Sequence, residues 1–273
     1  MNFSLLQNFN KAFFEKKPFP YLVIENALPE SACDELIKTF PIKSFEEMKK
    51  FNLSNERLDL IYNQPKKKSS IIVWDRSEIP NCWNEFMDQN TNNEFKLKLR
   101  EIFKESFELI YQKQFPKAED IFSNITVSAN SPVKNNANSV RTAHLDQPSK
   151  LYTGLYYLRD DNDSTNGGDL DLLRWNENII HQNDKAYFAR KSEIQNNKVN
   201  TFKTVKYKKN TFIIFLNTID SLHGVTKRDI TKNLRKFCVL TGGLDHTLYS
   251  KGLSKKGTIF RFLKNIFTPK NLF

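Results

Sequence analysis

The stretch that decides the fold is residues 141–158, which read RTAHLDQPSKLYTGLYYL. Two short β-rich runs follow one another here, from Val140 to Asp146 and from Leu151 to Leu158. β-Branched and aromatic residues favour strands, and turn residues at the ends of such runs mark their limits. We therefore predict two consecutive strands at this point of the chain.

The same pattern of short β-rich runs continues on both sides of this stretch, from about residue 121 onward. Short β-rich runs alternate with segments of Asn, Asp, Gly and Lys, a spacing that predicts a sandwich or barrel of strands. The further runs are Ile125 to Ala129, Asp169 to Trp175, Val199 to Tyr207, Thr211 to Leu216 and Arg235 to Gly242. The segment from Asn176 to Asn200 interrupts them, and a connection of that length is more often functional than idle.

The first 120 residues predict a mixed and mainly helical part. Helical spacing of apolar residues predicts a helix from Thr91 to Gln112, and Pro29 to Phe40 begins with a proline followed by acidic residues. Phe19 to Glu25 and Ile71 to Trp74 are expected strands. We expect one structural domain with three parts: 1–120 packed on the core, a catalytic core over 121–245, and an amphipathic tail over 246–273 that docks on it.

Composition limits the class of protein. The chain has 273 residues, 39% of them hydrophobic, and its 23 Phe and 9 Tyr can bury a substantial core. The sequence contains no run of about 18 apolar residues, so it predicts no membrane span. Its first residues do not resemble a secretory signal. Three isolated cysteines without CxxC spacing predict neither a disulfide framework nor a zinc site, and fit a reducing cytoplasm.

The net charge of +11 invites a nucleic-acid interpretation, which we do not favour. The 42 basic residues are 32 Lys and 10 Arg, and the chain is also rich in Asn. Joint enrichment in these two residue types is what an AT-rich genome produces without any binding purpose. We therefore expect no nucleic-acid partner, and a basic surface that steers an anionic substrate or co-substrate.

Metal-binding chemistry is indicated by the few histidines. His144 and Asp146 are separated by one residue, so on a strand both side chains project from the same face. His223 lies 77 residues after Asp146, just beyond the apolar run from Thr211 to Leu216. Two His and one carboxylate form the facial triad of non-haem Fe(II) oxygenases, with open positions for a co-substrate and dioxygen. We expect structural roles for His181 and His246.

Several motifs, taken as a set, resemble a known superfamily over residues 121–243. They are His144-x-Asp146, the strand Thr153-Gly-Leu-Tyr-Tyr-Leu158, the turn Asn166-Gly-Gly-Asp169, the segment Asn217-Thr-Ile-Asp-Ser-Leu-His223-Gly-Val225, and Arg235 at the start of a strand. This set resembles the 2-oxoglutarate/Fe(II)-dependent dioxygenases, and it is most similar to their prolyl-4-hydroxylase-like branch. The opening Pro18 to Pro29 is similar to the N-terminus of small microbial and phage members.

The resemblance implies a mixed α+β fold, with a double-stranded β-helix (jelly-roll) core and N-terminal supporting helices. It implies oxidative decarboxylation of 2-oxoglutarate to succinate and CO2, coupled to hydroxylation of a C–H bond by dioxygen, with ascorbate as a candidate cofactor. His144, Asp146 and His223 would hold Fe(II). Arg235 would bind the distal carboxylate of 2-oxoglutarate, with Tyr157 as its partner. Because Asp146 fills the position that related halogenases leave for chloride, hydroxylation is favoured.

A second arginine competes for the 2-oxoglutarate carboxylate. Arg228 follows His223 after five residues, whereas Arg235 follows after twelve, which is longer than in many relatives. We favour Arg235 because it starts a strand whose side chains can point into the barrel. Arg228 lies in a polar turn beside Lys227 and Asp229, where a solvated charge is expected.

Other roles stay open at this stage. The substrate is a prolyl or other amino-acid residue, a small metabolite, or a glycan or lipid precursor. The alternatives are a non-catalytic jelly roll that binds a glycan or anionic partner, and an isomerase with another metal on the same ligands. Asp220 and Ser221 could orient His223 or form a turn, and residues 176–200 and 43–70 are candidate lids. Candidate substrate contacts are Arg141, Tyr187, Phe188 and Arg190.

Overall fold

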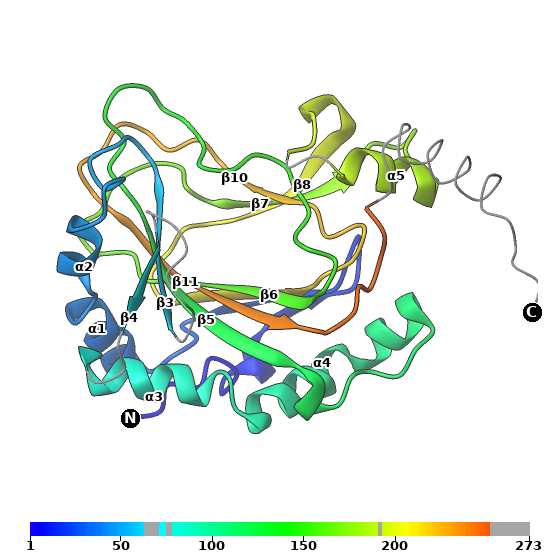
Figure 1. Ribbon diagram of the computed structural model, residues 1–273, viewed down its shortest axis with the longest axis horizontal. Helices are drawn as coiled ribbons and strands as arrows, with labels where there is room; N and C mark the ends of the chain where they lie inside the picture. The colour runs from blue at the N-terminus through cyan, green and yellow to red at the C-terminus, as the bar shows by residue number, and fades with distance from the viewer. Residues whose placement is uncertain (63–70, 75–77, 191–192, 252–273) are drawn as a thin grey trace, which may run out of the picture.

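Two β-sheets face each other and form the centre of the molecule (Figure 1). The computed structural model describes residues 1–62, 71–74, 78–190 and 193–251. The larger sheet has eight strands in the order β1-β2-β9-β6-β11-β5-β3-β4, and the smaller has the order β10-β7-β8. All strand pairs are antiparallel except β3 with β4. This arrangement confirms the predicted mixed α+β jelly-roll fold.

The strands of the two sheets have the following bounds. The larger sheet contains β1 (Phe13–Glu15), β2 (Tyr21–Glu25), β3 (Arg57–Tyr62), β4 (Ile71–Trp74), β5 (Phe122–Asn130), β6 (Lys150–Tyr157), β9 (Thr211–Leu216) and β11 (Arg235–Gly243). The smaller sheet contains β7 (Leu170–Trp175), β8 (Val199–Val205) and β10 (His223–Val225). Strands β1 to β4 join the first 120 residues and the later part of the chain in one sheet.

Strand β9 shows why some runs in the sequence are apolar without interruption. Phe212 and Ile214 face the helices that cover the large sheet, whereas Ile213 and Phe215 face the space between the sheets. All six residues of the strand are buried. A strand that is covered on both faces loses the polar alternation of a half-exposed strand.

Helices cover the face of the large sheet that points away from the small sheet (Figure 1). They are α1 (Glu30–Lys38), α2 (Ile42–Glu46), α3 (Asn81–Gln89) and α4 (Asn93–Tyr111), while α5 (Gln182–Ala189) lies apart from them near the small sheet. Short 3-10 turns occupy Phe9–Lys11, Ala118–Asp120 and Asn196–Lys198. Along the described ranges, no helix combines the length and apolar character needed to cross a bilayer.

Helix α4 agrees with its predicted span. Asn92 caps its first turn, because the side-chain oxygen accepts a hydrogen bond from the Phe95 N–H at 2.9 Å. The helix ends at Gln112, which has a left-handed φ of 51°. Ile110 shares the helical spacing of the buried apolar residues but is not buried: its exposed fraction is 43%, and it lines an open pocket of about 560 Å³ at the end of the helix.

Parts of two predicted segments lie outside the described residues. These are residues 63–70 of the candidate lid at 43–70 and residues 252–273 of the amphipathic tail predicted over 246–273.

Candidate metal centre

A close pairing of two chain segments brings His144 and His223 together. His223 begins β10, and the His144 N–H donates to the His223 carbonyl at 2.9 Å while the His223 N–H donates back at 3.1 Å. The two imidazole centroids are 4.2 Å apart. The predicted strand from Val140 to Asp146 is wrong in extent, since only this isolated bridge forms at His144. The segment follows β10 irregularly, and its next main-chain contact is the Val225 N–H to the Arg141 carbonyl at 2.9 Å.

Main-chain carbonyls orient both rings. The Nδ1 atom of His144 lies 2.8 Å from the Thr142 carbonyl oxygen, and Nδ1 of His223 lies 3.0 Å from the Ser221 carbonyl oxygen. A carbonyl can only accept, so the proton sits on Nδ1 in each ring and the lone pair is on Nε2. Histidines that bind metals are oriented in the same way by a second partner. Both Nε2 atoms are therefore ready to accept a cation.

Asp146 completes the cluster. Thr153 of β6 donates to Asp146 Oδ2 at 2.6 Å, and Lys150 Nζ lies 3.3 Å from Oδ1. One ligand atom from each of His144, Asp146 and His223 lies within 4.8 Å of the other two, and all three residues are buried. The structure thus brings together the three residues that the sequence predicts as ligands. Their donor set, two imidazole nitrogens and one carboxylate, suits a divalent transition metal.

The protonation states also suit a cation. Burial lowers the pKa of His144 to about 2, helped by the nearby charges of His223 and Arg141. Burial likewise lowers the pKa of His223. For Asp146, burial acts to raise the pKa, but Lys150, His223 and the hydrogen bond from Thr153 bring it below its ordinary value. At neutral pH the cluster therefore offers two neutral imidazoles and one carboxylate, which is the form that binds metals.

These shifts predict a pH dependence of stability in the metal-free protein. Below pH 6.5 the unfolded chain binds protons that the buried imidazole of His144 does not, so the free energy of unfolding falls as the pH falls. From pH 7 to pH 5 we expect His144 to contribute a loss of about 2 kcal/mol. The lowered pKa of Asp146 acts in the same direction only below about pH 4.

Urea unfolding of the metal-free protein at pH 7 and pH 5 measures this loss. The loss should shrink in His144→Gln and persist in His246→Gln, since His246 is exposed beside Asp245. Equal pH dependence in the wild type and in His144→Gln would rule the explanation out.

Arg235 and Tyr157 lie on the face of the large sheet that points toward the small sheet. The Arg235 side chain is 2% exposed; its Nε donates to the Gly168 carbonyl at 2.6 Å, and Nη1 contacts Asn130 Oδ1 at 3.3 Å. Its guanidinium carbon lies 5.2 Å from the centre of the Tyr157 ring. Gly168, with φ of +77°, leaves room here, because a Cβ atom would lie 3.0 Å from Arg235 Cδ.

Several buried polar atoms on Arg235 and on the strands beside it have no hydrogen-bond partner within the described residues. They are Arg235 Nη2, Tyr157 Oη, Asn130 Nδ2 and Thr211 Oγ1. The strand register places these side chains on the inner face of the large sheet, with Arg235 opposite Asn130 and Tyr157 opposite Thr211. Buried polar groups are rarely left unpaired. A carboxylate beside Arg235 would accept hydrogen bonds from Arg235 Nη2 and from the Tyr157 hydroxyl and would balance the buried charge, so these two residues fit the distal carboxylate of 2-oxoglutarate.

Asn130 and Thr211 were not predicted as site residues. Both are common in turns and strand ends, and only the pairing across strands places them beside Arg235 and Tyr157.

Arg228 corrects one prediction. It was expected to be a solvated turn residue, but its side chain is 1% exposed. The loop after β10 folds back onto residue 138, where the Arg228 N–H donates to the Asn138 carbonyl at 2.9 Å. Its Nη1 and Nη2 donate to the carbonyls of Ser131 and Asn233 at 3.2 and 2.7 Å. The Nη1 and Nη2 donors of Arg228 are therefore engaged in hydrogen bonds that connect loops. Arg235, in contrast, keeps an Nη2 donor without a partner among the described residues.

The segment from 176 to 200 packs behind the ligands. Its residues Ile179 and Ile194 belong to one apolar cluster. The same cluster contains the neighbours of the predicted ligands in the sequence, Ala143, Leu145 and Leu222. The Ile194 N–H donates to the Ala143 carbonyl at 2.7 Å. The described part of this segment thus holds the ligand-bearing chain from the side opposite His144 and Asp146.

The remaining predicted residues have separate contacts. Tyr187 and Arg190 stack on each other, with 4.3 Å between the guanidinium carbon and the ring centre, and the Phe188 ring lies 6.5 Å from that of Trp175. His181 is exposed and lies outside the cluster. Asp220 pairs with Lys185 of α5 at 2.8 Å. The Ser221 hydroxyl stabilises the turn at 217–221, and its carbonyl orients His223.

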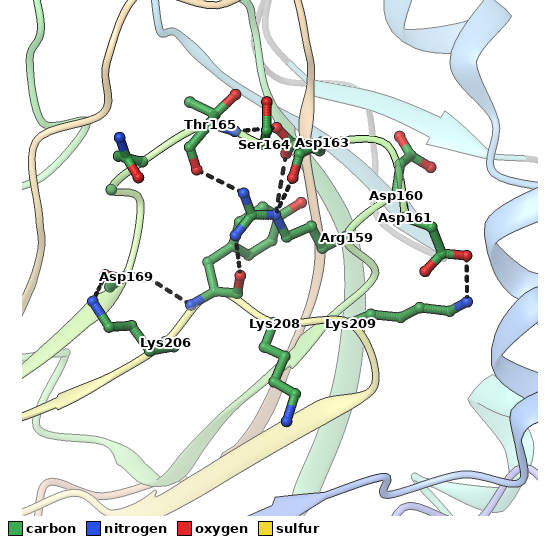
Figure 2. A pocket seen from close by; sticks show the side chains of 13 residues that line it. Arg159, Asp160, Asp161, Asp163, Ser164, Thr165, Asp169, Lys206, Lys208 and Lys209 are labelled. Atoms are coloured by element: carbon green, nitrogen blue, oxygen red, sulfur yellow. Dashed lines mark hydrogen bonds and ion pairs between the residues drawn. The ribbon is translucent and has the colours of Figure 1, made fainter.

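A different pocket, of about 480 Å³, lies between residues 159–169 and 206–209 (Figure 2). Its charged groups are already paired: Lys206 lies 2.9 Å from Asp169, and Lys209 lies 2.8 Å from Asp161. Arg159 donates three hydrogen bonds to main-chain carbonyls. Because these groups satisfy one another, the pocket is not favoured as a reaction site.

Comparison with known proteins gives structural matches alone. The sequence matches no protein-family model and no curated protein sequence. A prolyl 4-hydroxylase from Phytophthora capsici is 16% identical with a TM-score of 0.45, over 90% of this chain and 68% of that one. One from Pseudomonas putida is 12% identical with a TM-score of 0.45, over 83% and 93%. A prolyl hydroxylase from Trichoplax adhaerens, in complex with a hypoxia inducible factor peptide fragment, is 14% identical with a TM-score of 0.41, over 82% and 84%.

Proposed function

We propose that the protein is an Fe(II)- and 2-oxoglutarate-dependent oxygenase that hydroxylates a C–H bond of its substrate. The observation that carries this proposal is the pairing of two sites in one barrel. A cluster of two imidazoles and a carboxylate shares the space between the sheets with a buried arginine whose Nη2 has no partner. A metal and a dicarboxylate would satisfy both.

Each residue has a distinct role in this proposal. His144 and His223 would bind Fe(II) through Nε2, and Thr153 would hold the Asp146 carboxylate in place. Arg235 and Tyr157 would orient 2-oxoglutarate by its distal carboxylate. Apolar side chains such as Ile213, Phe215 and Phe237 line the space between the sheets and would exclude water.

Bound iron and 2-oxoglutarate would supply the oxidising chemistry: dioxygen delivers one oxygen atom to 2-oxoglutarate, which becomes succinate and CO2, and the other to the substrate C–H bond. The protein contributes orientation and a dry environment, in which the charged contacts of Arg235 are stronger than in water.

The non-catalytic alternative, a jelly roll that binds a glycan or anionic partner, explains less. Surface binding does not require a buried Arg235 with an unpaired donor, nor two histidines whose Nε2 atoms face one carboxylate. The unpaired donor of Arg235 does not contribute to stability without a ligand, since unpaired buried polar groups are costly.

The reaction itself is tested by succinate release. Aerobic incubation with Fe(II), ascorbate and 2-oxoglutarate should produce succinate slowly even without substrate, and omission of iron or oxygen should reduce it to background. Chromatographic quantification of succinate measures this. If succinate formation were independent of iron, the oxygenase proposal would fail.

A further inference from the structure

Three cationic residues, Arg141, Lys150 and Lys251, belong to segments that run beside the metal centre. Lys150, at the start of β6, lies 3.3 Å from Asp146 Oδ1. Lys251 Nζ donates to the Leu145 carbonyl at 3.0 Å. Arg141 lies three residues before His144, and its carbonyl accepts a hydrogen bond from the N–H of Val225, two residues after His223, at 2.9 Å. The two lysines therefore lie beside the Asp146 segment, and Arg141 lies on the chain that links it to His223.

The segment that carries Lys251 is held in this place by two contacts. The Leu248 N–H donates to the Pro148 carbonyl at 2.8 Å, and the Tyr249 hydroxyl donates to the Asp146 carbonyl at 3.1 Å. The C-terminal end of the described chain thus runs beside the segment that contains the predicted ligands. Lys251 is consequently part of the surroundings of the metal centre.

The negative charge near these cations is too small to balance them. Among the described residues, neither Arg141 nor Lys251 forms an ion pair with a carboxylate. Asp146 pairs with Lys150 at 3.3 Å, and its charge and that of the exposed Glu193 are the negative charges that act on Arg141. Asp146 would share its charge with a bound metal and would then compensate the three cations less. Arg57 adds no free charge, since it pairs with Asp59 at 2.9 Å.

These cations can be reached from solvent, unlike Arg235. Arg141 is exposed, the Lys150 side chain is 27% exposed, and Lys251 is half-buried. A partly desolvated position strengthens ion pairing without closing the site to a ligand. The planar fork of arginine also matches a carboxylate or phosphate group through two hydrogen bonds.

We propose that the substrate carries an anionic group, a carboxylate or a phosphate, which Arg141, Lys150 and Lys251 hold beside the metal centre. This inference rests on the proposed oxygenase function and names the chemical class of its substrate. The anion would anchor the substrate at the rim, so that a neighbouring C–H bond faces the open side of the metal.

Calorimetric titration of the full chain, loaded with Mn(II) and 2-oxoglutarate, tests this inference. The probes are methyl phosphate, acetate and the neutral acetamide, all at constant ionic strength. We expect saturable binding of at least one anion and none of acetamide, and the preferred anion distinguishes phosphate from carboxylate. Arg141→Gln and Lys251→Gln should each weaken that binding by at least about tenfold, since each removes a charge-assisted hydrogen bond.

Lys208→Gln is the matched control, because it removes the same charge from a surface lysine that pairs with Glu25. Its affinity for the anion should equal that of the wild type. Absence of anion binding, or equal weakening in Lys208→Gln and Arg141→Gln, would overturn the inference. The preceding titration with 2-oxoglutarate separates the two proposals: its failure overturns both, whereas normal 2-oxoglutarate binding without anion binding overturns only this one.

Discussion

Asp146→Ala is expected to abolish 2-oxoglutarate turnover and to lower metal affinity by more than about 100-fold, which exceeds the usual effect of losing a residue that only supports a ligand. Within the part of the chain that the structure describes, Asp146 is the only carboxylate in the cluster with His144 and His223. Its removal would leave two neutral imidazoles to hold a dication. It would also leave the positive charge of Lys150, 3.3 Å from Asp146 Oδ1, without its partner.

Two further variants separate charge from structure. Asp146→Asn keeps the size of the side chain and should lose metal binding nearly as completely, because the amide carries no negative charge. Asp161→Ala is the control, since Asp161 is exposed and pairs with Lys209. Titration calorimetry with Mn(II) measures the affinities. Retention of wild-type metal affinity in both Asp146 variants would show that the carboxylate is not a ligand.

Arg235→Gln is expected to raise the Kd for 2-oxoglutarate by about 100-fold while leaving metal affinity unchanged, since loss of a buried charged hydrogen-bond partner costs roughly 2–5 kcal/mol. The free Nη2 donor and the nearby Tyr157 hydroxyl are the groups that the distal carboxylate would satisfy. Arg235→Lys keeps the charge but loses the planar fork, and should give an intermediate Kd.

The comparison with Arg228 makes this prediction specific. Arg228→Gln should lower the melting temperature, because it removes the hydrogen bonds to the carbonyls of Ser131 and Asn233. It should change the Kd for 2-oxoglutarate by no more than a few-fold. Titrations of the manganese-loaded variants give both constants. The reverse pattern, with 2-oxoglutarate binding lost in Arg228→Gln and kept in Arg235→Gln, would assign the carboxylate to Arg228.

Local patterns in the sequence predicted much of the fold. The run from Thr211 to Leu216 forms β9 with the same bounds, and the helical spacing of Phe95, Leu99 and Phe103 matches the buried face of α4. Strand β3 was not predicted, although Leu58 and Leu60 alternate with Arg57 and Asp59, which is a strand pattern. In the folded protein the two charged residues of this strand, Arg57 and Asp59, form an ion pair with each other.

Features that depend on distant parts of the chain could not be predicted in the same way. The spacing of His144 and Asp146 suggests one face of a strand, but their distance from His223 depends on a pairing across almost 80 residues. Arg228 has a polar sequence around it and becomes buried only because its loop returns to Asn138. Strand register likewise is what places Asn130 beside Arg235 and Thr211 beside Tyr157.

The proposed function requires that His144, Asp146 and His223 bind one ferrous ion beside 2-oxoglutarate. Visible absorption spectroscopy under anaerobic conditions is the most direct test of this requirement. Addition of both Fe(II) and 2-oxoglutarate to the protein should produce a metal-to-ligand charge-transfer band that neither produces alone. The band should be absent in Asp146→Ala and require more 2-oxoglutarate in Arg235→Gln. Absence of the band in the wild type, or its persistence in Asp146→Ala, would contradict this assignment.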